Sequence, residues 1–169
     1  MARQPIRYPM GSISSGTMRL EDLIPCFTSE LSSLSRQPGI VSAKQRKEHA
    51  KLVREIEARI DADSDYYDSD SADSDLEQLC DALGEYAGPY FYFGAHPGDC
   101  ADYGWFLSQE SLDEDIHDGV VFVEDDCDRH GYQDAPRKYR GLVLHVSDHG
   151  NMTLYRQTSR ARHEIWGVI

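Results

Sequence analysis

The feature of this sequence that most limits its fold is a long acidic segment, residues 60–128, that contains no Lys or Arg. The segment carries 21 Asp and Glu, whereas segments 1–59 and 129–169 each have a net charge of +4, which together give the −13 of the whole chain. A block of like charge raises a strong negative potential, which repels nucleic acid and anionic membranes and favours a basic partner. The seven aspartates of 61–75 are dense enough to oppose a helix, so we expect a loop there.

Chain length and apolar content fit a folded domain without a membrane span. The 169 residues are enough to bury a core without disulfides or metals, and no apolar run approaches the ~18 residues of a transmembrane helix. No apolar segment follows Arg3 and Arg7, so we expect no signal peptide and a cytoplasmic location. The four Cys lack a zinc-binding spacing, and a disulfide between Cys100 and Cys127 stays open.

Three helices are predicted in the first half of the chain, after a flexible arm at 1–17. Apolar residues at helical spacing predict the first helix from residue 18 to the break at Gln37-Pro38-Gly39. The second helix is predicted at 42–60, with Ser42 as its N-cap. The third is predicted at 75–86, directly after the aspartate loop.

The second half of the chain has the pattern of β-strands joined by turns. Aromatic and β-branched runs separated by Gly, Pro and Asp predict a short helix at 111–119 and strands at 90–94, 103–107, 120–124, 139–147, 151–156 and 164–169. We therefore predict a single α+β domain over 18–169. In it, N-terminal helices (18–87) pack on a mainly antiparallel C-terminal β-sheet (88–169) of five or six strands.

The acidic segment has three interpretations. The first is a solvated loop, which is what charge runs usually form. The second is a calcium site at 61–72, in which Asp61, Asp63 and Asp65 match EF-hand ligand positions, although Tyr66 replaces the glycine and Ala72 the bidentate glutamate. The third is a mimic of nucleic acid, because solvated surfaces normally mix both signs of charge and closely spaced carboxylates imitate phosphates. On the third interpretation the predicted partner-binding residues are Asp61, Asp63, Asp65, Asp68, Asp70, Asp73, Asp75, Glu77, Asp113, Glu114, Asp115, Asp125 and Asp126.

Two turns that contain His and Asp are the candidates for a metal site. The run GAHPGD at 94–99 resembles the AHPDD turn of zinc-dependent deacetylases of the LmbE type, with Gly in place of the first Asp. The alternative is a hairpin turn in which His96 and Asp99 cap backbone groups. A metal-dependent enzyme would use His96, Asp99 and Asp102, with His145 or His149 from the second turn.

The segment PYFYFGAHPGDCADYGWFLS has the pattern of an aromatic hairpin with a G-x-H-x-G-D turn; LEQLCDALGEYAG precedes it and LHVSDHGNMTLYR follows it. This pattern resembles a group of uncharacterised bacterial and prophage proteins over about residues 76–169. The resemblance implies a phage or mobile-element setting, in which small acidic proteins include anti-CRISPR and anti-restriction inhibitors. It implies no catalytic residues.

The function predicted from these features is a non-enzymatic inhibitor. By DNA mimicry it would bind the basic, nucleic-acid-binding surface of a host defence protein such as a nuclease complex. This prediction requires no metal, cofactor, membrane or direct contact with nucleic acid. The sequence leaves the identity of the partner and the oligomeric state open.

Overall fold

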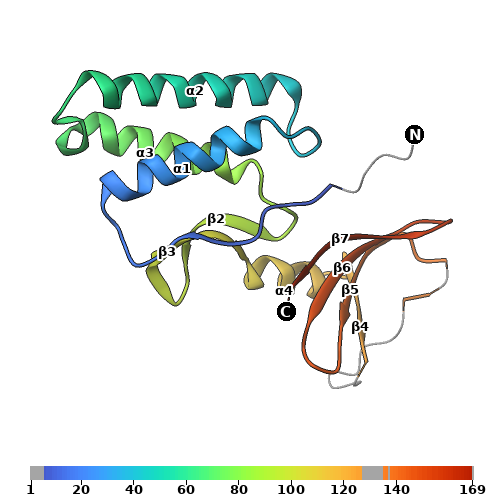
Figure 1. Cartoon of the computed structure of the whole chain (residues 1–169). Coiled ribbons are helices and arrows are strands. Elements are labelled where there is room, and N and C mark those ends of the chain that lie inside the picture. Colours follow the sequence, from blue (N-terminus) through green and yellow to red (C-terminus); the bar gives the residue numbers. More distant parts are fainter. Residues whose placement is uncertain (1–5, 127–134, 137, 169) are drawn as a thin grey trace. The chain divides into compact units, whose positions relative to one another are not determined.

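The computed structural model describes residues 6–126, 135–136 and 138–168. Within these residues the chain has four α-helices and two β-sheets, which confirms the predicted α+β class. The described residues fall into two compact units, one within Pro9–Leu107 and one within Met1–Tyr8 and Ser108–Ile169. The single domain over 18–169 stays a prediction. Figure 1 shows the elements of each unit.

The first unit contains the three predicted helices and a small sheet. Helix α1 (Leu20–Ser35) packs against both α2 (Ala43–Ala62) and α3 (Asp70–Gly84), while α3 also contacts strand β2 (Phe91–His96). In Figure 1 the helices cover one face of this sheet, and α2 is the helix farthest from it. The predicted order of the helices is confirmed, and so is the amphipathic character of α1, which buries Leu23, Ile24, Phe27, Leu31 and Leu34.

Helix α2 begins with Ser42 as its N-cap, which confirms that prediction, and the cap is a capping box with Gln45. The side chain of Ser42 accepts a hydrogen bond from the backbone N–H of Gln45 at 3.2 Å, and the side chain of Gln45 accepts one from the backbone N–H of Ser42 at 3.0 Å. These two bonds satisfy N–H groups that have no partner inside the helix. The start of α2 is therefore fixed by its own sequence.

Helix α3 begins five residues earlier than predicted, so the expected loop at 61–75 is wrong in its second half. Ser69 is the N-cap, and Asp70 and Asp73 lie in the first turn, where carboxylates interact favourably with the positive end of the helix dipole. The buried Ala72 and Leu79 hold this turn against the core. Between α2 and α3 the chain forms only a short 3-10 turn, η1 (Tyr66–Asp68).

The sheet of the first unit has the strand order β1-β3-β2, with β1 at Gly11–Ser14 and β3 at Asp99–Leu107. The prediction of a flexible arm over 1–17 is therefore wrong at β1, which pairs antiparallel with β3. This pairing depends on Gly104, because a Cβ there would lie 2.1 Å from the carbonyl oxygen of Gly11. The aromatic hairpin β2–β3 is confirmed, but it forms its own sheet with β1.

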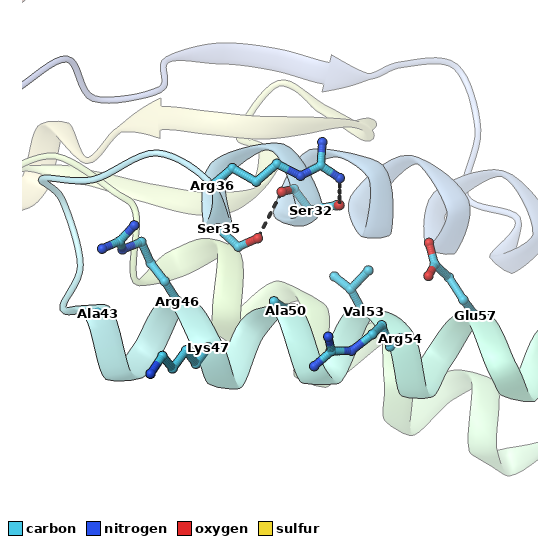
Figure 2. Close-up of a pocket in the computed structure, with 10 residues that line it drawn as sticks. All are labelled: Ser32, Ser35, Arg36, Ala43, Arg46, Lys47, Ala50, Val53, Arg54 and Glu57. Carbon is cyan, nitrogen blue, oxygen red and sulfur yellow. Dashed lines mark hydrogen bonds between the residues drawn. The ribbon is translucent and has the colours of Figure 1, made fainter.

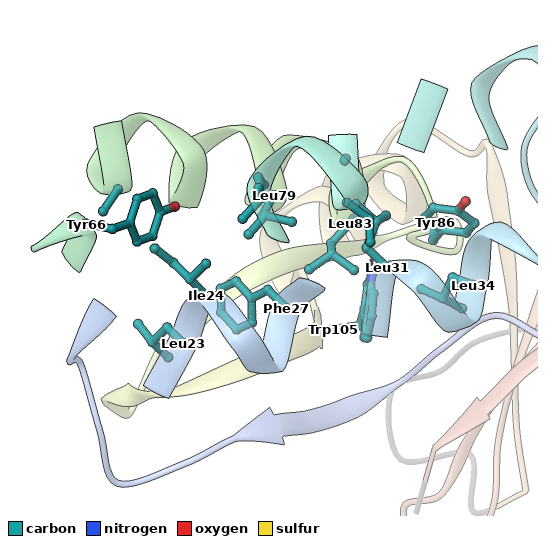
Figure 3. Close-up of a cluster of buried hydrophobic side chains, with 14 residues drawn as sticks. Leu23, Ile24, Phe27, Leu31, Leu34, Tyr66, Leu79, Leu83, Tyr86 and Trp105 are labelled. Atoms are coloured by element: carbon teal, nitrogen blue, oxygen red, sulfur yellow. Dashed lines mark hydrogen bonds between the residues drawn. The ribbon is translucent and has the colours of Figure 1, made fainter. Parts of the chain in front are cut away.

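The core of the first unit lies between the helices and this sheet, as Figure 3 shows. The rings of Phe27 on α1 and Phe93 on β2 meet edge to face at 5.1 Å between centroids. Trp105 is buried, and its indole N–H donates to the carbonyl oxygen of Leu83 at 3.1 Å, which ties β3 to the end of α3. Burial of these aromatic side chains holds α1 and α3 on the sheet.

The second unit contains a four-stranded sheet of order β4-β5-β6-β7 and one helix, α4 (Gln109–His117). Strands β5, β6 and β7 pair antiparallel, whereas β4 pairs parallel with β5, so the predicted C-terminal sheet is mainly antiparallel. Its buried side chains include Leu112, Val143, Leu154 and Trp166. The strands run over Val121–Asp125 (β4), Gly141–Val146 (β5), Met152–Gln157 (β6) and Arg162–Val168 (β7).

The disulfide left open between Cys100 and Cys127 is not tested, because Cys127 lies outside the described residues.

Candidate acidic binding surface

One face of α3 carries a row of exposed carboxylates. Asp70, Asp73, Glu77 and Asp81 lie three or four residues apart, and Glu85 continues the row at the C-cap. Residues at this spacing share one face of a helix, and a rise of roughly 1.5 Å per residue makes the row about 22 Å long. The carboxylates therefore follow one another about every 6 Å along the helix.

The end of α2 and the turn before α3 add four exposed aspartates to this row. Within the turn, a side-chain oxygen of Asp63 accepts a hydrogen bond from the backbone N–H of Asp65 at 2.9 Å. Among the described residues, no Lys or Arg forms an ion pair with any of these nine carboxylates. We call this surface the acidic face, and it consists of Asp61, Asp63, Asp65, Asp68, Asp70, Asp73, Glu77, Asp81 and Glu85.

A hollow of about 400 Å³ lies between α2 and α3 beside the acidic face. Four carboxylates line it, from Glu48, Glu55, Asp81 and Glu85, and its one ammonium group, from Lys51, lies 3.3 Å from Glu55. The hollow is therefore negative overall. Its charge and size favour a Lys or Arg side chain presented by a partner.

Asp75 is not a binding residue, although it was predicted to be one. Its side chain is buried, and it accepts hydrogen bonds from Arg59 Nε at 2.8 Å, Arg59 Nη2 at 2.7 Å and the hydroxyl of Tyr66 at 2.9 Å. Burial and the bond to Asp75 raise the pKa of Tyr66. Asp75 thus connects α2, η1 and α3 inside the first unit, and a partner cannot reach it.

The remaining predicted carboxylates belong to the second unit. Asp113 and Glu114 are exposed on α4, whereas Asp115 and Asp125 are half-buried. Asp126 is exposed and lies 3.0 Å from His145 Nε2. These residues are therefore divided between exposed and partly covered positions, unlike the continuous row on α3.

Glu124, one of the acids of the segment 60–128, forms a bidentate ion pair in the second unit that the sequence did not predict. Arg162 donates from Nη1 and Nη2 to the two carboxylate oxygens of Glu124, at 2.7 and 2.9 Å. The guanidinium also lies over the ring of Tyr155, 5.5 Å from its centroid. The hydrogen bonds from Arg162 lower the pKa of Glu124. Because β4 and β7 are 38 residues apart at this pair, nothing in the local sequence indicates it.

A second missed feature lies on the other side of α2, where Arg36, Arg46, Lys47 and Arg54 line a hollow against α1. Its signal in the sequence was the net charge of +4 over 1–59. A sharper signal of this cluster was the helical spacing of its residues. Arg54 follows Arg46 by eight positions and Lys47 by seven, which places the three on one side of a helix.

The His/Asp turn at 94–99 has the contacts of a hairpin turn. His96 Nδ1 accepts a hydrogen bond from the backbone N–H of Gly98 at 3.0 Å, and Asp99 Oδ1 accepts one from that of Ala101 at 3.0 Å. Asp102 accepts one from the hydroxyl of Ser12. Over the residues that the structure describes, no three His, Cys, Asp or Glu side chains gather as metal ligands would.

The proposed calcium segment at 61–72 is divided among three elements. Asp61 lies in the last turn of α2, and Asp63 is its C-cap. Ala72, at the position where an EF-hand has its bidentate glutamate, is fully buried in α3. The carboxylates before it therefore face solvent on a helix end and a tight turn.

The chain matches no protein-family model, and no curated protein or solved structure proved similar to it. Across the described residues, no helix combines the length and hydropathy that crossing a membrane requires.

Proposed function

We propose that this protein is a non-enzymatic interaction protein whose acidic face binds a basic, nucleic-acid-binding surface of another protein. The observation that carries the proposal is the row of exposed carboxylates on α3 and in the turn before it, which has no Lys or Arg paired to it among the described residues. One strand of DNA presents a phosphate about every 3.4 Å of axis. The row on α3 presents a carboxylate about every 6 Å, so its negative charge per unit length is about half that of one DNA strand.

The negative hollow between α2 and α3 supports the same proposal. Glu48, Glu55, Asp81 and Glu85 surround a space of about 400 Å³, which would receive one basic side chain of the partner while the row contacts its neighbours. The net charge of −13 adds long-range attraction, which accelerates association with a cationic surface and makes binding sensitive to salt.

A narrower proposal identifies the partner as a defence protein of a bacterial host, such as a nuclease complex, and this protein as its phage-encoded or mobile-element-encoded inhibitor. That step rests on the resemblance of residues 76–169 to bacterial and prophage proteins. Inhibition would follow from occupation of the groove that the partner uses for nucleic acid.

The experiment is a pull-down from bacterial lysate with wild type and two variants that lose the same four charges from different places. The α3 variant replaces four carboxylates of the acidic face: Asp70→Asn, Asp73→Asn, Glu77→Gln and Asp81→Asn. The α4 variant is the matched control: Glu110→Gln, Asp113→Asn, Glu114→Gln and Asp118→Asn. Bound proteins are identified by mass spectrometry and challenged with high salt and with short duplex DNA.

We expect wild type and the α4 variant to retain a nucleic-acid-binding protein that high salt releases and duplex DNA displaces. The α3 variant should retain little of it. Equal capture by all three proteins would refute a role for the acidic face. Equal loss in both variants would show that net charge, and not the row on α3, determines binding.

A further inference from the structure

The groove between α1 and α2 in the first unit has a volume of about 500 Å³. Figure 2 shows the two walls of the groove. Ser32, Ser35 and Arg36 form the wall at α1, and α2 forms the other wall with Ala43, Arg46, Lys47, Ala50, Val53, Arg54 and Glu57. We call this hollow the basic groove. Binding pockets for small molecules have volumes of about 300–1,000 Å³, so its size suits one.

The groove concentrates positive charge in a protein that is strongly acidic overall. Four cations line it, from Arg36, Arg46, Lys47 and Arg54, against the single carboxylate of Glu57. None of the four forms an ion pair with a carboxylate in the part of the chain that the structure describes. Cations that serve only solubility normally alternate with acids, as Lys44 does with Glu48 on the outer side of α2.

Two buried polar atoms face this region without a protein partner. Nε of Arg46 is buried and makes no hydrogen bond. The same holds for the hydroxyl of Thr28, which lines a second hollow of about 430 Å³ between α1 and α2. The two hollows share Ser32, Arg36 and Glu57, so they adjoin each other. Buried donors without partners are rare in folded proteins, so the two atoms mark a part of the α1–α2 packing where polar groups lack a partner within the protein.

Arg36 is held along α1 by a contact within the same helix. Its Nη2 donates to the hydroxyl oxygen of Ser32 at 2.8 Å, one helical turn away, as the dashed line in Figure 2 shows. A guanidinium fixed in this way loses less freedom when it binds an oxyanion. Figure 2 also shows the side chain of Arg46 rising from α2 toward α1. Two arginines from facing helices therefore border one space.

We propose that the basic groove binds a phosphorylated small molecule through its phosphate groups. Arg46 and Arg54 donate to phosphate oxygens, for which the planar guanidinium is well matched, and Arg36 donates from the opposite wall. The adjoining hollow, with Thr28, Ile60 and Tyr67, accommodates the uncharged remainder of the ligand. Glu57, at the junction, repels further phosphates and accepts hydrogen bonds from hydroxyl groups. This site shares no lining residue with the acidic face.

The observations favour a small molecule over a nucleic acid strand. The cations are confined to one groove between two helices, whereas a strand requires positive charge along an extended track. The other side of α2 and all of α3 present carboxylates, which repel the rest of a polyanion.

The test is isothermal titration calorimetry of the whole chain with inorganic pyrophosphate and with ADP, at matched ionic strength. Arg46→Gln and Arg54→Gln should each weaken binding at least about tenfold, because each removes charge-assisted hydrogen bonds to phosphate. Lys44→Gln is the matched control, since it removes the same charge from α2 outside the groove. Circular dichroism shows whether each variant is folded. If the Arg46 variant fails to fold, the Arg54 variant alone tests the proposal, because Arg54 is exposed and its replacement should not disturb the core.

Binding of both ligands with losses confined to the two groove variants supports the proposal. Tighter binding of ADP than of pyrophosphate assigns the second hollow to the nucleoside, and equal binding assigns the site to phosphate groups alone. Absence of binding to either ligand, an equal loss in Lys44→Gln, or binding of a short oligonucleotide without either small molecule would each overturn it.

Discussion

Replacing Asp75 by Asn tests whether one buried carboxylate holds α3 to α2 and to the turn between them. The carboxylate accepts three hydrogen bonds of 2.7–2.9 Å, two from Arg59 on α2 and one from Tyr66 in η1. An amide of the same shape keeps one oxygen as an acceptor. However, it loses the negative charge and turns an N–H₂ group toward donors that need an acceptor.

The expected loss is about 3 kcal/mol of unfolding free energy. Removing one partner of a buried ion pair costs about 3–5 kcal/mol, because the remaining charge stays uncompensated. Here the side chain of Arg59 is 41% exposed, so water stabilises its guanidinium in part and the cost lies at the low end of that range. Tyr66 adds to the loss, because its hydroxyl is buried and has no other described hydrogen bond.

The assay is urea unfolding followed by tryptophan fluorescence. Trp105 is buried in the first unit, and Trp166 lies in the second, so a Trp166→Phe background makes the signal report on the first unit alone. Asp73→Asn is the control, because it removes the same charge from an exposed position two residues away. Because Asp73 lies in the first turn of α3, its loss removes a helix-dipole interaction and should lower the unfolding free energy by less than about 1 kcal/mol. If Asp75→Asn costs no more than this control, the carboxylate does not hold the three elements together.

Three further predictions concern single sites. Glu124→Gln should lower the unfolding free energy of the second unit by about 1–2 kcal/mol in urea. Because Arg162 lowers the pKa of Glu124, this contribution is present above the unfolded-state pKa of roughly 4.3 and is lost as pH falls through the folded value, so the variant's stability should depend less on acid. Gly104→Ala places a Cβ against a β1 carbonyl and should cost about 2 kcal/mol in thermal unfolding; no loss would contradict the pairing. Cys80, whose pKa burial raises to about 11, should react with iodoacetamide more slowly than the exposed Cys100, as peptide mass spectrometry measures.

The helices could be predicted because their signals are local. The apolar spacing of α1 and the Ser42–Gln45 capping box of α2 act within a few residues of each other. The start of α3 could not be predicted in the same way. Like charge over 61–75 argued for a loop, but Asp70 and Asp73 lie in the first turn of the helix, where the helix dipole favours carboxylates. Ala72 in the same turn is buried, and only the packed structure shows that contact with the core.

Apart from β1, the strands could be located in sequence, but they could not be assigned to sheets. Strand β1 has the sequence GSIS, which carries no strand pattern, and it pairs with β3 because Gly104 leaves room for its backbone. Strand β4 pairs parallel with β5, whose first residue follows 16 positions after the end of β4. Both pairings are non-local, and local propensity contains no information about them.

The surfaces depend on the fold in different degrees. The acidic face follows from sequence once α3 is known to begin at Asp70, because its carboxylates then fall on one side of the helix. The basic groove needs the packing of α1 on α2 as well, since Arg36 and Arg46 come from facing helices. The composition therefore indicated that the chain has acidic and basic segments, and the structure shows on which surfaces the carboxylates and the cations lie.

Cations lie on one side of α2 and carboxylates on the other. The salt dependence of pyrophosphate affinity therefore tests the basic groove and the acidic face together. At about 0.01 M salt the Debye length is about 30 Å, so the carboxylates on the other side of a helix roughly 10 Å thick repel an anion near the groove. At about 0.1 M it is about 10 Å, which weakens this repulsion more than the direct contact of Arg46 with a phosphate. Pyrophosphate affinity should therefore rise over this range in wild type, and the rise should be smaller in the α3 variant, which loses four of the carboxylates. A wild-type affinity that only falls with salt would show that the acidic face does not act on the groove.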